Sequence, residues 1–180
     1  MLLAKLPCLD KGYVALLDSC NPIKKLRDID EEFFNSRFPP SLLDLGVMTL
    51  AIKCPLFVQL NLCKFNLTVL NAETKGSSGV EAYEPNPGEI GAAELSTSES
   101  ISADIGRTTA ALLMNPLAYQ ADGADRFISQ IITPLSVYTT LIVQGSYDEW
   151  CKFCDQGKVP APIAAYINAV KQIKDVEWKQ

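Results

Sequence analysis

The chain has 180 residues, of which 48% are hydrophobic and 21% charged, and this composition is typical of one soluble globular domain with its own core. Its formal net charge of −5 argues against a sequence-independent nucleic-acid binder, which needs a basic surface to neutralise phosphates. The sequence contains no histidine, so histidine-based acid–base catalysis and histidine metal sites are excluded.

Targeting signals are weak along the chain. The opening MLLAKLPCL is too short for the apolar region of a signal peptide, and Lys5 interrupts it. No apolar run reaches the roughly 18 residues needed to span a bilayer. The six cysteines are spread through apolar surroundings, which is typical of reduced thiols. We therefore expect a cytoplasmic protein that contacts neither membrane nor nucleic acid.

The first half of the chain predicts two strands and two helices. Gly12–Asp18 and Val47–Lys53 are short apolar runs typical of buried strands. Residues 22–35 have apolar side chains at helical spacing, with charges between them. A second helix is expected from Pro55, which suits a first helical turn, to about Leu67. Its predicted apolar face consists of Leu56, Leu60, Cys63 and Leu67.

A long stretch rich in Gly, Ser, Glu and Pro follows, from Asn71 to about Leu95. We expect it to form a surface loop, flexible over about residues 72–95, because loops of this length are usually functional or disordered. Ser96 and Glu99 then form a capping-box pattern for a helix through Met114.

The C-terminal third predicts helices around one further strand. Asp122 could cap a helix that Pro134 ends, and Ser136–Gly145 is β-branched and strand-like. Ser146 and Glu149 repeat the capping-box pattern before a short helix, and a last helix starts near Pro162. The whole chain, 1–180, thus predicts a single α/β or α+β domain with a central mixed sheet flanked by helices.

The pair Cys151 and Cys154 forms a CxxC motif. A zinc site would need two further ligands, and the sequence offers neither a second CxxC nor a histidine. A redox CxxC is expected at the start of a helix that follows a strand, where the thiolate is stabilised. Both cysteines fall inside a predicted amphipathic helix, so the pattern favours packing.

Other polar patterns favour structural roles. The acidic runs at 30–32 and 148–149 are typical of solvated helix faces. Gly76–Gly79 lacks the Lys-Ser/Thr of a phosphate loop, so a flexible loop is favoured. Arg107 and Arg126 lie beside apolar residues on predicted helices, where a salt bridge is more common than a ligand contact.

The run from Asp122 to Phe153 carries a more specific pattern. IITPLSVYTTLIVQG (131–145), followed by Lys152–Phe153, resembles the signature region of flavin-dependent thymidylate synthases. In that family a helix ending in a leucine–proline step leads to a Tyr-Thr strand, a glycine or asparagine turn and a helix carrying His-Phe. Upstream strands and the final helix fit as well, so the resemblance covers about Gly12 to Val170. It implies the thymidylate-synthase-complementing-protein-like fold and a homotetramer with sites at subunit interfaces.

The family's chemistry lies in an Arg-His-Arg motif followed by Ser, Asn-Glu and Ser-Gly-Arg elements. In this chain the motif position reads Lys64–Phe65–Asn66. Further losses fall near Leu45, where a histidine is expected, and at about Gly157, where an arginine is expected. By the resemblance, the flavin-contacting positions are Lys64, Asn66 and Asn71, and the substrate-contacting positions are Asn61, Thr74, Arg126 and Gln130.

These replacements remove the strongest phosphate contacts. Bidentate arginines hold phosphate through charge-assisted hydrogen bonds, each contributing roughly 1.5–3 kcal/mol. Losing two or three of them lowers affinity by several orders of magnitude. FAD is the one cofactor that the resemblance implies, and the losses argue against its binding; no metal is expected.

Three hypotheses remain open. The chain is a non-catalytic, oligomeric relative of the family that binds a nucleotide or a protein partner, including an intact catalytic homologue. Alternatively, it is an active FAD-dependent enzyme that methylates dUMP with methylenetetrahydrofolate, using Lys64, Asn71, Arg107 and Arg126. The third hypothesis is an unrelated α/β domain.

Overall fold

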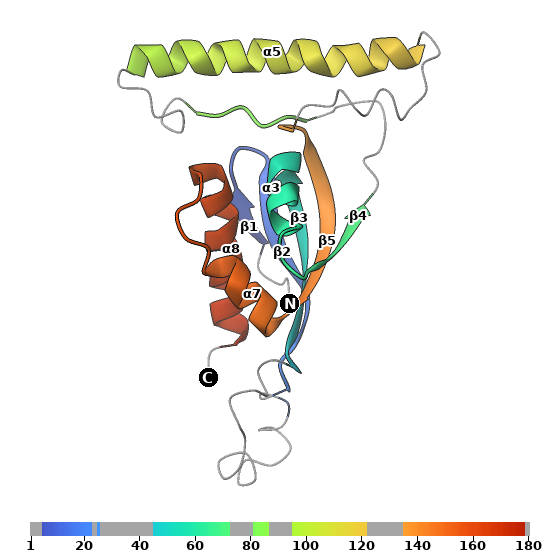
Figure 1. The fold of residues 1–180 in the computed structure, drawn as a ribbon, viewed down its shortest axis with the longest axis vertical. Helices are drawn as coiled ribbons and strands as arrows, with labels where there is room; N and C mark the ends of the chain where they lie inside the picture. The colour runs from blue at the N-terminus through green and yellow to red at the C-terminus, as the bar shows by residue number, and fades with distance from the viewer. Residues whose placement is uncertain are drawn as a thin grey trace.

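A five-stranded antiparallel sheet organises the computed structural model, which describes residues 5–22, 25, 45–72, 81–86, 95–121 and 135–178. The strand order is β1-β2-β3-β5-β4 (Figure 1). The strands are β1 (Lys5–Cys8), β2 (Gly12–Cys20), β3 (Val47–Pro55), β4 (Thr68–Ala72) and β5 (Tyr138–Ser146). An α+β fold is therefore confirmed, although the strand pairs described are all antiparallel and not mixed as expected.

The centre of the sheet is the nine-residue ladder between β3 and β5, which runs from Val47↔Ser146 to Pro55↔Tyr138. Burial alternates along β3, as it must when only one face of a strand meets a core. Three predicted strands are confirmed here as β2, β3 and β5, each shifted or extended at its ends. The edge strands β1 and β4 were not predicted.

Three helices cover one face of this sheet (Figure 1). They are α3 (Leu56–Leu62), α7 (Tyr147–Cys154) and α8 (Ala161–Glu177). Trp150 and Phe153 of α7 are fully buried in this core, and the Trp150 indole donates a hydrogen bond of 3.1 Å to the carbonyl of Met48. The buried tryptophan therefore anchors α7 to the central strand without leaving its polar atom unpaired.

Helix α5 (Leu95–Ala121) lies across the end of the sheet, away from α7 (Figure 1). It begins one residue before Ser96, so the predicted cap at Ser96 is wrong, and it continues beyond the predicted end at Met114. Over residues 99–112, Thr109 is the one buried side chain. The Ser102 hydroxyl donates a hydrogen bond of 2.7 Å to the carbonyl of Pro85, which ties the helix to residues 81–86.

Helix α3 differs from the prediction in both length and buried face. It ends at Leu62, and the chain turns at Cys63 towards β4 instead of continuing to Leu67. Its buried residues include Asn61, whereas Leu60 is 55% exposed. Seven residues give under two helical turns, which is short for a helix. The helix ends there because the following residues form β4 and pair with β5, and this pairing overrides the apolar spacing of the sequence.

Residues 81–86 pack on the sheet inside the stretch predicted to be a surface loop. Ala82 bridges Val137, and the Tyr83 amide donates a hydrogen bond of 2.8 Å to the carbonyl of Ser136. Ala82 and Tyr83 are buried. The rest of that stretch beyond β4, 73–80 and 87–94, lies outside the described residues, as do the helix predicted at 122–134 and most of the one at 22–35.

None of the helices described is both long and apolar enough to cross a membrane.

Candidate functional site

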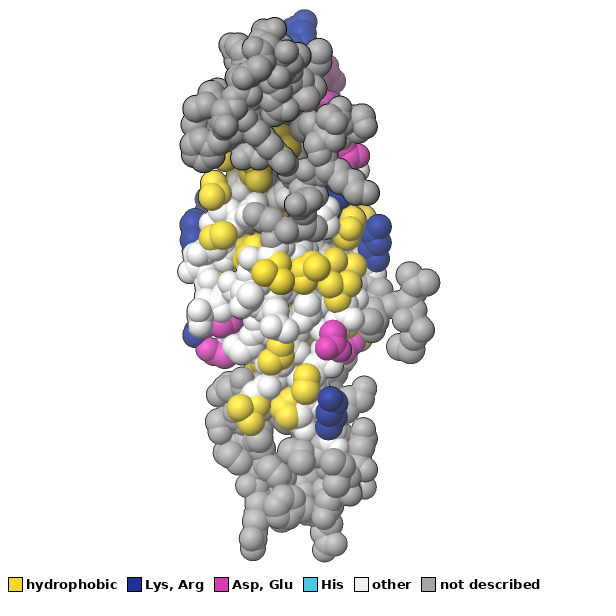
Figure 2. All heavy atoms as spheres, turned by 90° about the vertical axis from the view of Figure 1, so that its right-hand side faces the viewer, with side chains coloured by type: hydrophobic (Ala, Val, Ile, Leu, Met, Phe, Trp, Pro, Cys, Tyr) yellow, Lys and Arg dark blue, Asp and Glu magenta, His cyan; other side chains and the backbone are white. Residues whose placement is uncertain are grey.

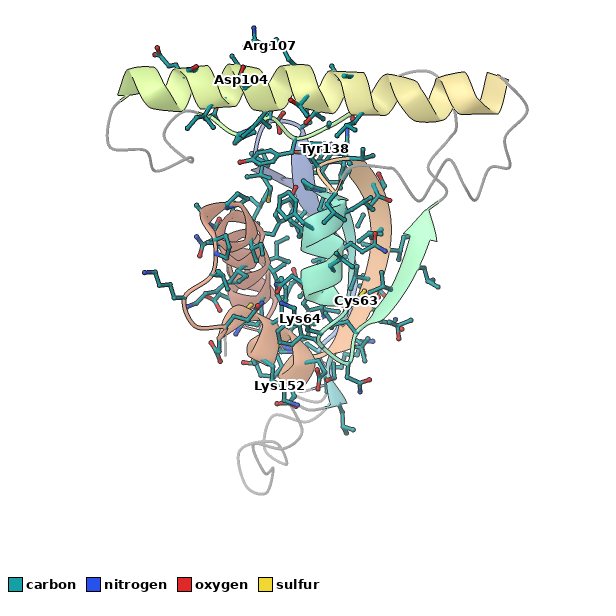
Figure 3. The ribbon with its side chains drawn as sticks, turned by 45° about the horizontal axis from the view of Figure 1, so that its top comes forward. Cys63, Lys64, Asp104, Arg107, Tyr138 and Lys152 are labelled. Atoms are coloured by element: carbon teal, nitrogen blue, oxygen red, sulfur yellow. The ribbon has the colours of Figure 1, made fainter. Side chains whose placement is uncertain are left out.

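The turn after α3 meets α7, so the two segments that the sequence resemblance matched to thymidylate-synthase motifs lie together. The Phe65 and Phe153 rings pack edge to face, with centroids 5.5 Å apart. Figure 3 shows Lys64 and Lys152 at the same end of the molecule, far from α5. By the resemblance, Phe65 stands where the family has a histidine, whereas Phe153 matches the phenylalanine of its His-Phe step and Lys152 takes the place of that step's histidine.

Charged and polar groups at this end are paired with one another. The backbone amide of Asn66 donates a hydrogen bond of 3.0 Å to Glu149 Oε2, and the Lys152 ammonium donates one of 2.8 Å to Glu149 Oε1. Lys152 also pairs with Asp148 at 2.6 Å. The Lys152 hydrogen bond and then the Asn66 amide lower the pKa of Glu149, and the two carboxylates raise the pKa of Lys152. Lys152 therefore already has two acceptors.

The capping prediction at this position is confirmed. Ser146 caps α7, its hydroxyl accepting a hydrogen bond of 3.3 Å from the Glu149 amide. The Glu149 side chain turns instead to Asn66 and Lys152, so the cap also fixes the carboxylate that holds the turn after α3.

Asn61 is nearly fully buried, at 4% exposure, behind the same turn. Its amide donates a hydrogen bond of 3.0 Å to Gln156 Oε1, and Gln156 Nε2 donates one of 2.8 Å to the carbonyl of Phe153. The resemblance assigned Asn61 to the substrate, but here it serves the packing of α3 on the end of α7. Such a pair satisfies buried polar atoms and leaves Asn61 poorly placed for a ligand.

Of the other predicted site residues, Lys64 lies at this end of the molecule and Arg107 does not. Lys64 is exposed in the turn, and Asn71 lies in β4 opposite Leu141, its side chain outside the described residues. Arg107 lies on α5 at the opposite end from Lys64 (Figure 3), 77% exposed and paired with Asp104. A rewired site using Lys64 and Arg107 together therefore cannot form within one protomer. Thr74, Arg126 and Gln130 lie outside the described residues.

A second polar cluster, which the sequence did not indicate, lies where β5 begins. The Tyr138 hydroxyl donates a hydrogen bond of 2.6 Å to Asp10 Oδ1, and the Tyr166 hydroxyl donates one of 2.9 Å to the carbonyl of Lys53. Burial, and then the Asp10 hydrogen bond, raises the pKa of Tyr138. Both phenols therefore stay protonated at neutral pH and act as donors. Tyr138 and Asp10 are 128 positions apart, so no sequence spacing could have predicted the pair.

Two buried thiols lie near these phenols. Burial raises the pKa of Cys8 to about 11 and that of Cys54 to about 12. Thiols of this kind are poor nucleophiles at neutral pH. The cluster is therefore a structural network and not a reactive centre.

A hollow of about 310 Å³ lies on α5. Its lining includes Asp104 and no cation, so it lacks the groups that hold phosphate. Within the described ranges, no three Cys, Asp or Glu side chains lie close enough to hold a metal ion.

A scan against models of known protein families finds no match for this chain, and a search of curated proteins finds none either.

Proposed function

We propose that the chain is a non-catalytic relative of the flavin-dependent thymidylate synthases that acts as an oligomeric scaffold and binds a nucleotide or a protein partner. The main support is that Phe65, which the resemblance matches to the histidine of the Arg-His-Arg motif, packs against Phe153. Around these rings, Asn61 donates a hydrogen bond to Gln156, and Glu149 accepts hydrogen bonds from the Asn66 backbone amide and from Lys152. These groups therefore already have partners within the protein.

The electrostatics support the loss of catalysis. Flavin and deoxyuridine phosphates need several fixed cations, and arginine is the usual one. At this end Lys152 is held by two carboxylates and Lys64 is exposed on a turn. One exposed lysine contributes a single, hydrated charge, which is far weaker than a set of buried bidentate arginines.

The oligomeric part of the proposal rests on the sheet face that no described helix covers. Register places Ala15, Ala51, Ile142 and Leu70 side by side across β2, β3, β5 and β4. Figure 2, viewed from the β4–β5 side, shows hydrophobic side chains gathered across the middle of the face and charges near its margins. Ile142 is 38% exposed and Leu70 is 59% exposed. An apolar centre with a polar rim is typical of a protein interface.

The occupant that fits this apolar row is a second copy of the chain. The row places its two alanines at one end and its two large side chains at the other. A two-fold axis parallel to the strands reverses the row in the second copy, so Leu70 meets Ala15 and Ile142 meets Ala51. Large side chains then fill the spaces over small ones, as in packed sheets about 10 Å apart.

The catalytic question is tested by the absorbance spectrum of freshly purified protein between about 300 and 550 nm, before and after addition of FAD and dUMP. The proposal predicts a colourless protein that leaves added FAD with its free spectrum. Bound flavin whose spectrum responds to dUMP would contradict it and would favour the rewired enzyme, to be followed by an assay of dUMP methylation.

The assembly is tested by Ile142→Glu, with Val176→Glu as the matched control, because Val176 is 71% exposed on α8, away from the row. A buried carboxylate without a partner disrupts an apolar interface. We expect Ile142→Glu to lower the mass in solution to that of the monomer and Val176→Glu to leave it unchanged. An unchanged mass for Ile142→Glu would rule out this face.

A further inference from the structure

The sulfur of Cys151, on α7, has a cation beside it. Lys174 Nζ of α8 lies 3.5 Å from Cys151 Sγ. Burial, and then the neighbouring Cys151, raises the pKa of Tyr147, so this phenol is protonated at neutral pH. The ammonium lies 5.4 Å from the centre of the Tyr147 ring, which holds it in place. The Lys174 ammonium therefore donates a hydrogen bond directly to this sulfur.

The cation is largely shielded from water. The Lys174 side chain is 12% exposed, and its acidic neighbour Asp175 lies at 3.9 Å and is half exposed. A shielded charge acts more strongly on a neighbouring sulfur than a hydrated one does. Cys151 itself is only partly buried, so a small oxidant can reach it.

The other cysteines lack this combination. Cys8 and Cys54 are buried and have raised pKa values. Cys20 has Lys25 at 3.6 Å, but that pair is exposed. Cys63 is exposed in the turn after α3. Reactivity is therefore expected to be greatest at Cys151.

Cys154 supplies a second thiol one helical turn after Cys151. It is the last residue of α7 and 7% exposed, and burial raises its pKa to about 11. Helical positions three apart have Cβ atoms about 5–6 Å apart, while a disulfide needs about 3.5–4.5 Å. In a 3₁₀ turn, side chains three positions apart eclipse each other and come closer together. A disulfide between these cysteines therefore requires the last turn of α7 to tighten to 3₁₀ geometry, which is common at helix ends.

We propose that Cys151 and Cys154 form a peroxide-sensitive dithiol. The Cys151 thiolate attacks one oxygen of a hydroperoxide, the O–O bond breaks, and the products are a Cys151 sulfenic acid and, after protonation, an alcohol or water. The Cys154 sulfur then attacks the sulfenic sulfur, slowly because its raised pKa keeps it a thiol, and its proton joins the leaving hydroxide as water while the disulfide forms. The two sulfurs lose two electrons in total, and the hydroperoxide gains them. This inference is independent of the proposed function.

The first experiment treats folded protein with one equivalent of hydrogen peroxide in the presence of dimedone and maps the products by mass spectrometry. Wild-type protein should yield a Cys151–Cys154 disulfide. The Cys154→Ser variant should instead yield a dimedone adduct on Cys151. Adducts on Cys63 or Cys20 with an unmodified Cys151 would overturn the proposal.

The second experiment measures alkylation of Cys151 by iodoacetamide at pH 7. Lys174→Gln should slow it about tenfold, because the variant lacks the ammonium that lies 3.5 Å from Cys151 Sγ. Lys171→Gln, an exposed lysine on the same helix, should not change the rate. An equal rate in Lys174→Gln would contradict the role of the cation.

Folding of each variant is checked by circular dichroism. A measurement on wild-type protein keeps the test valid if Lys174→Gln does not fold: the alkylation rate of Cys151 relative to Cys63 should fall to about one in urea. A ratio already at or below one in native protein would overturn the proposal.

Discussion

Helices α8 and α5 are the two long helices of the described residues, and they differ in how many side chains they bury. Helix α8 buries Tyr166, Ile167, Ala169, Val170 and Ile173 against the sheet. Helix α5 buries Thr109 alone over residues 99–112, although it is longer, at 27 residues against 17. Burial of an apolar face is the main source of helix stability in proteins. The contrast indicates that α8 is stabilised within one protomer, and it fits the proposed assembly if another copy covers α5.

The largest effect expected is a matched pair of isoleucine truncations in these two helices. Ile173→Ala in α8 removes a side chain that is 2% exposed and should lower the free energy of unfolding by about 2–5 kcal/mol. Ile101→Ala in α5 removes one that is 38% exposed and should cost under about 0.5 kcal/mol in dilute protein. Urea unfolding measures both, and equal losses would contradict the contrast.

Three glycine-to-alanine changes test how tightly the sheet region is packed. A Cβ on Gly12 would overlap the Tyr166 hydroxyl and lie 2.7 Å from the carbonyl oxygen of Cys8, and backbone there cannot yield easily. We expect Gly12→Ala to cost about 1–3 kcal/mol or more, by overpacking. Gly145→Ala meets the movable Leu67 side chain and should cost less.

Gly157→Ala is the control for this series. A Cβ at Gly157 meets nothing within 4 Å, so the free energy of unfolding should stay within about 0.5 kcal/mol of wild type. The expected loss of stability is largest for Gly12→Ala, smaller for Gly145→Ala and smallest for Gly157→Ala. Thermal or urea unfolding measures it, and any other order would show that the packing around Gly12 differs from the one described.

A smaller effect is expected from alkaline pH. Cys54 and Cys8 are neutral when protonated, and their folded pKa values of about 12 and about 11 lie above the unfolded value of about 8.5. Their stabilising contribution is therefore complete below about pH 8.5 and is lost as the pH rises through the folded values. Urea unfolding at pH 7 and pH 10 should show a loss of about 1–2 kcal/mol per thiol.

Two cysteine variants separate the ionisation of buried thiols from general alkaline damage. Cys54→Ala should flatten the dependence between pH 8.5 and pH 10, whereas Cys63→Ala, at an exposed position, should leave it unchanged. The same slope in both variants would show that the buried thiol is not responsible.

Elements that their own local sequence specifies were predicted, whereas elements that depend on pairing with distant segments were missed. β3 and β5 are apolar, β-branched runs that specify a strand locally, and Ser146 with Glu149 specified the start of α7. β4 was missed because Thr68–Ala72 carries no strong pattern and forms by pairing with the exposed edge of β5.

The candidate site was predictable only as positions along the chain. The resemblance placed Phe65 and Phe153 at corresponding motifs, and they are in contact. No pattern could show that Asn61 bonds to Gln156, 95 positions away, or that Arg107 lies at the other end of the molecule from Lys64. These facts depend on tertiary contacts, which local spacing does not encode.

The proposed assembly is tested most simply by the mass of the full chain in solution, measured by light scattering over a range of concentrations. We expect a folded assembly of at least two copies, with a mass of at least twice 19.7 kDa, because a second copy would cover the apolar row and α5. A folded protein of 19.7 kDa at every concentration would contradict it.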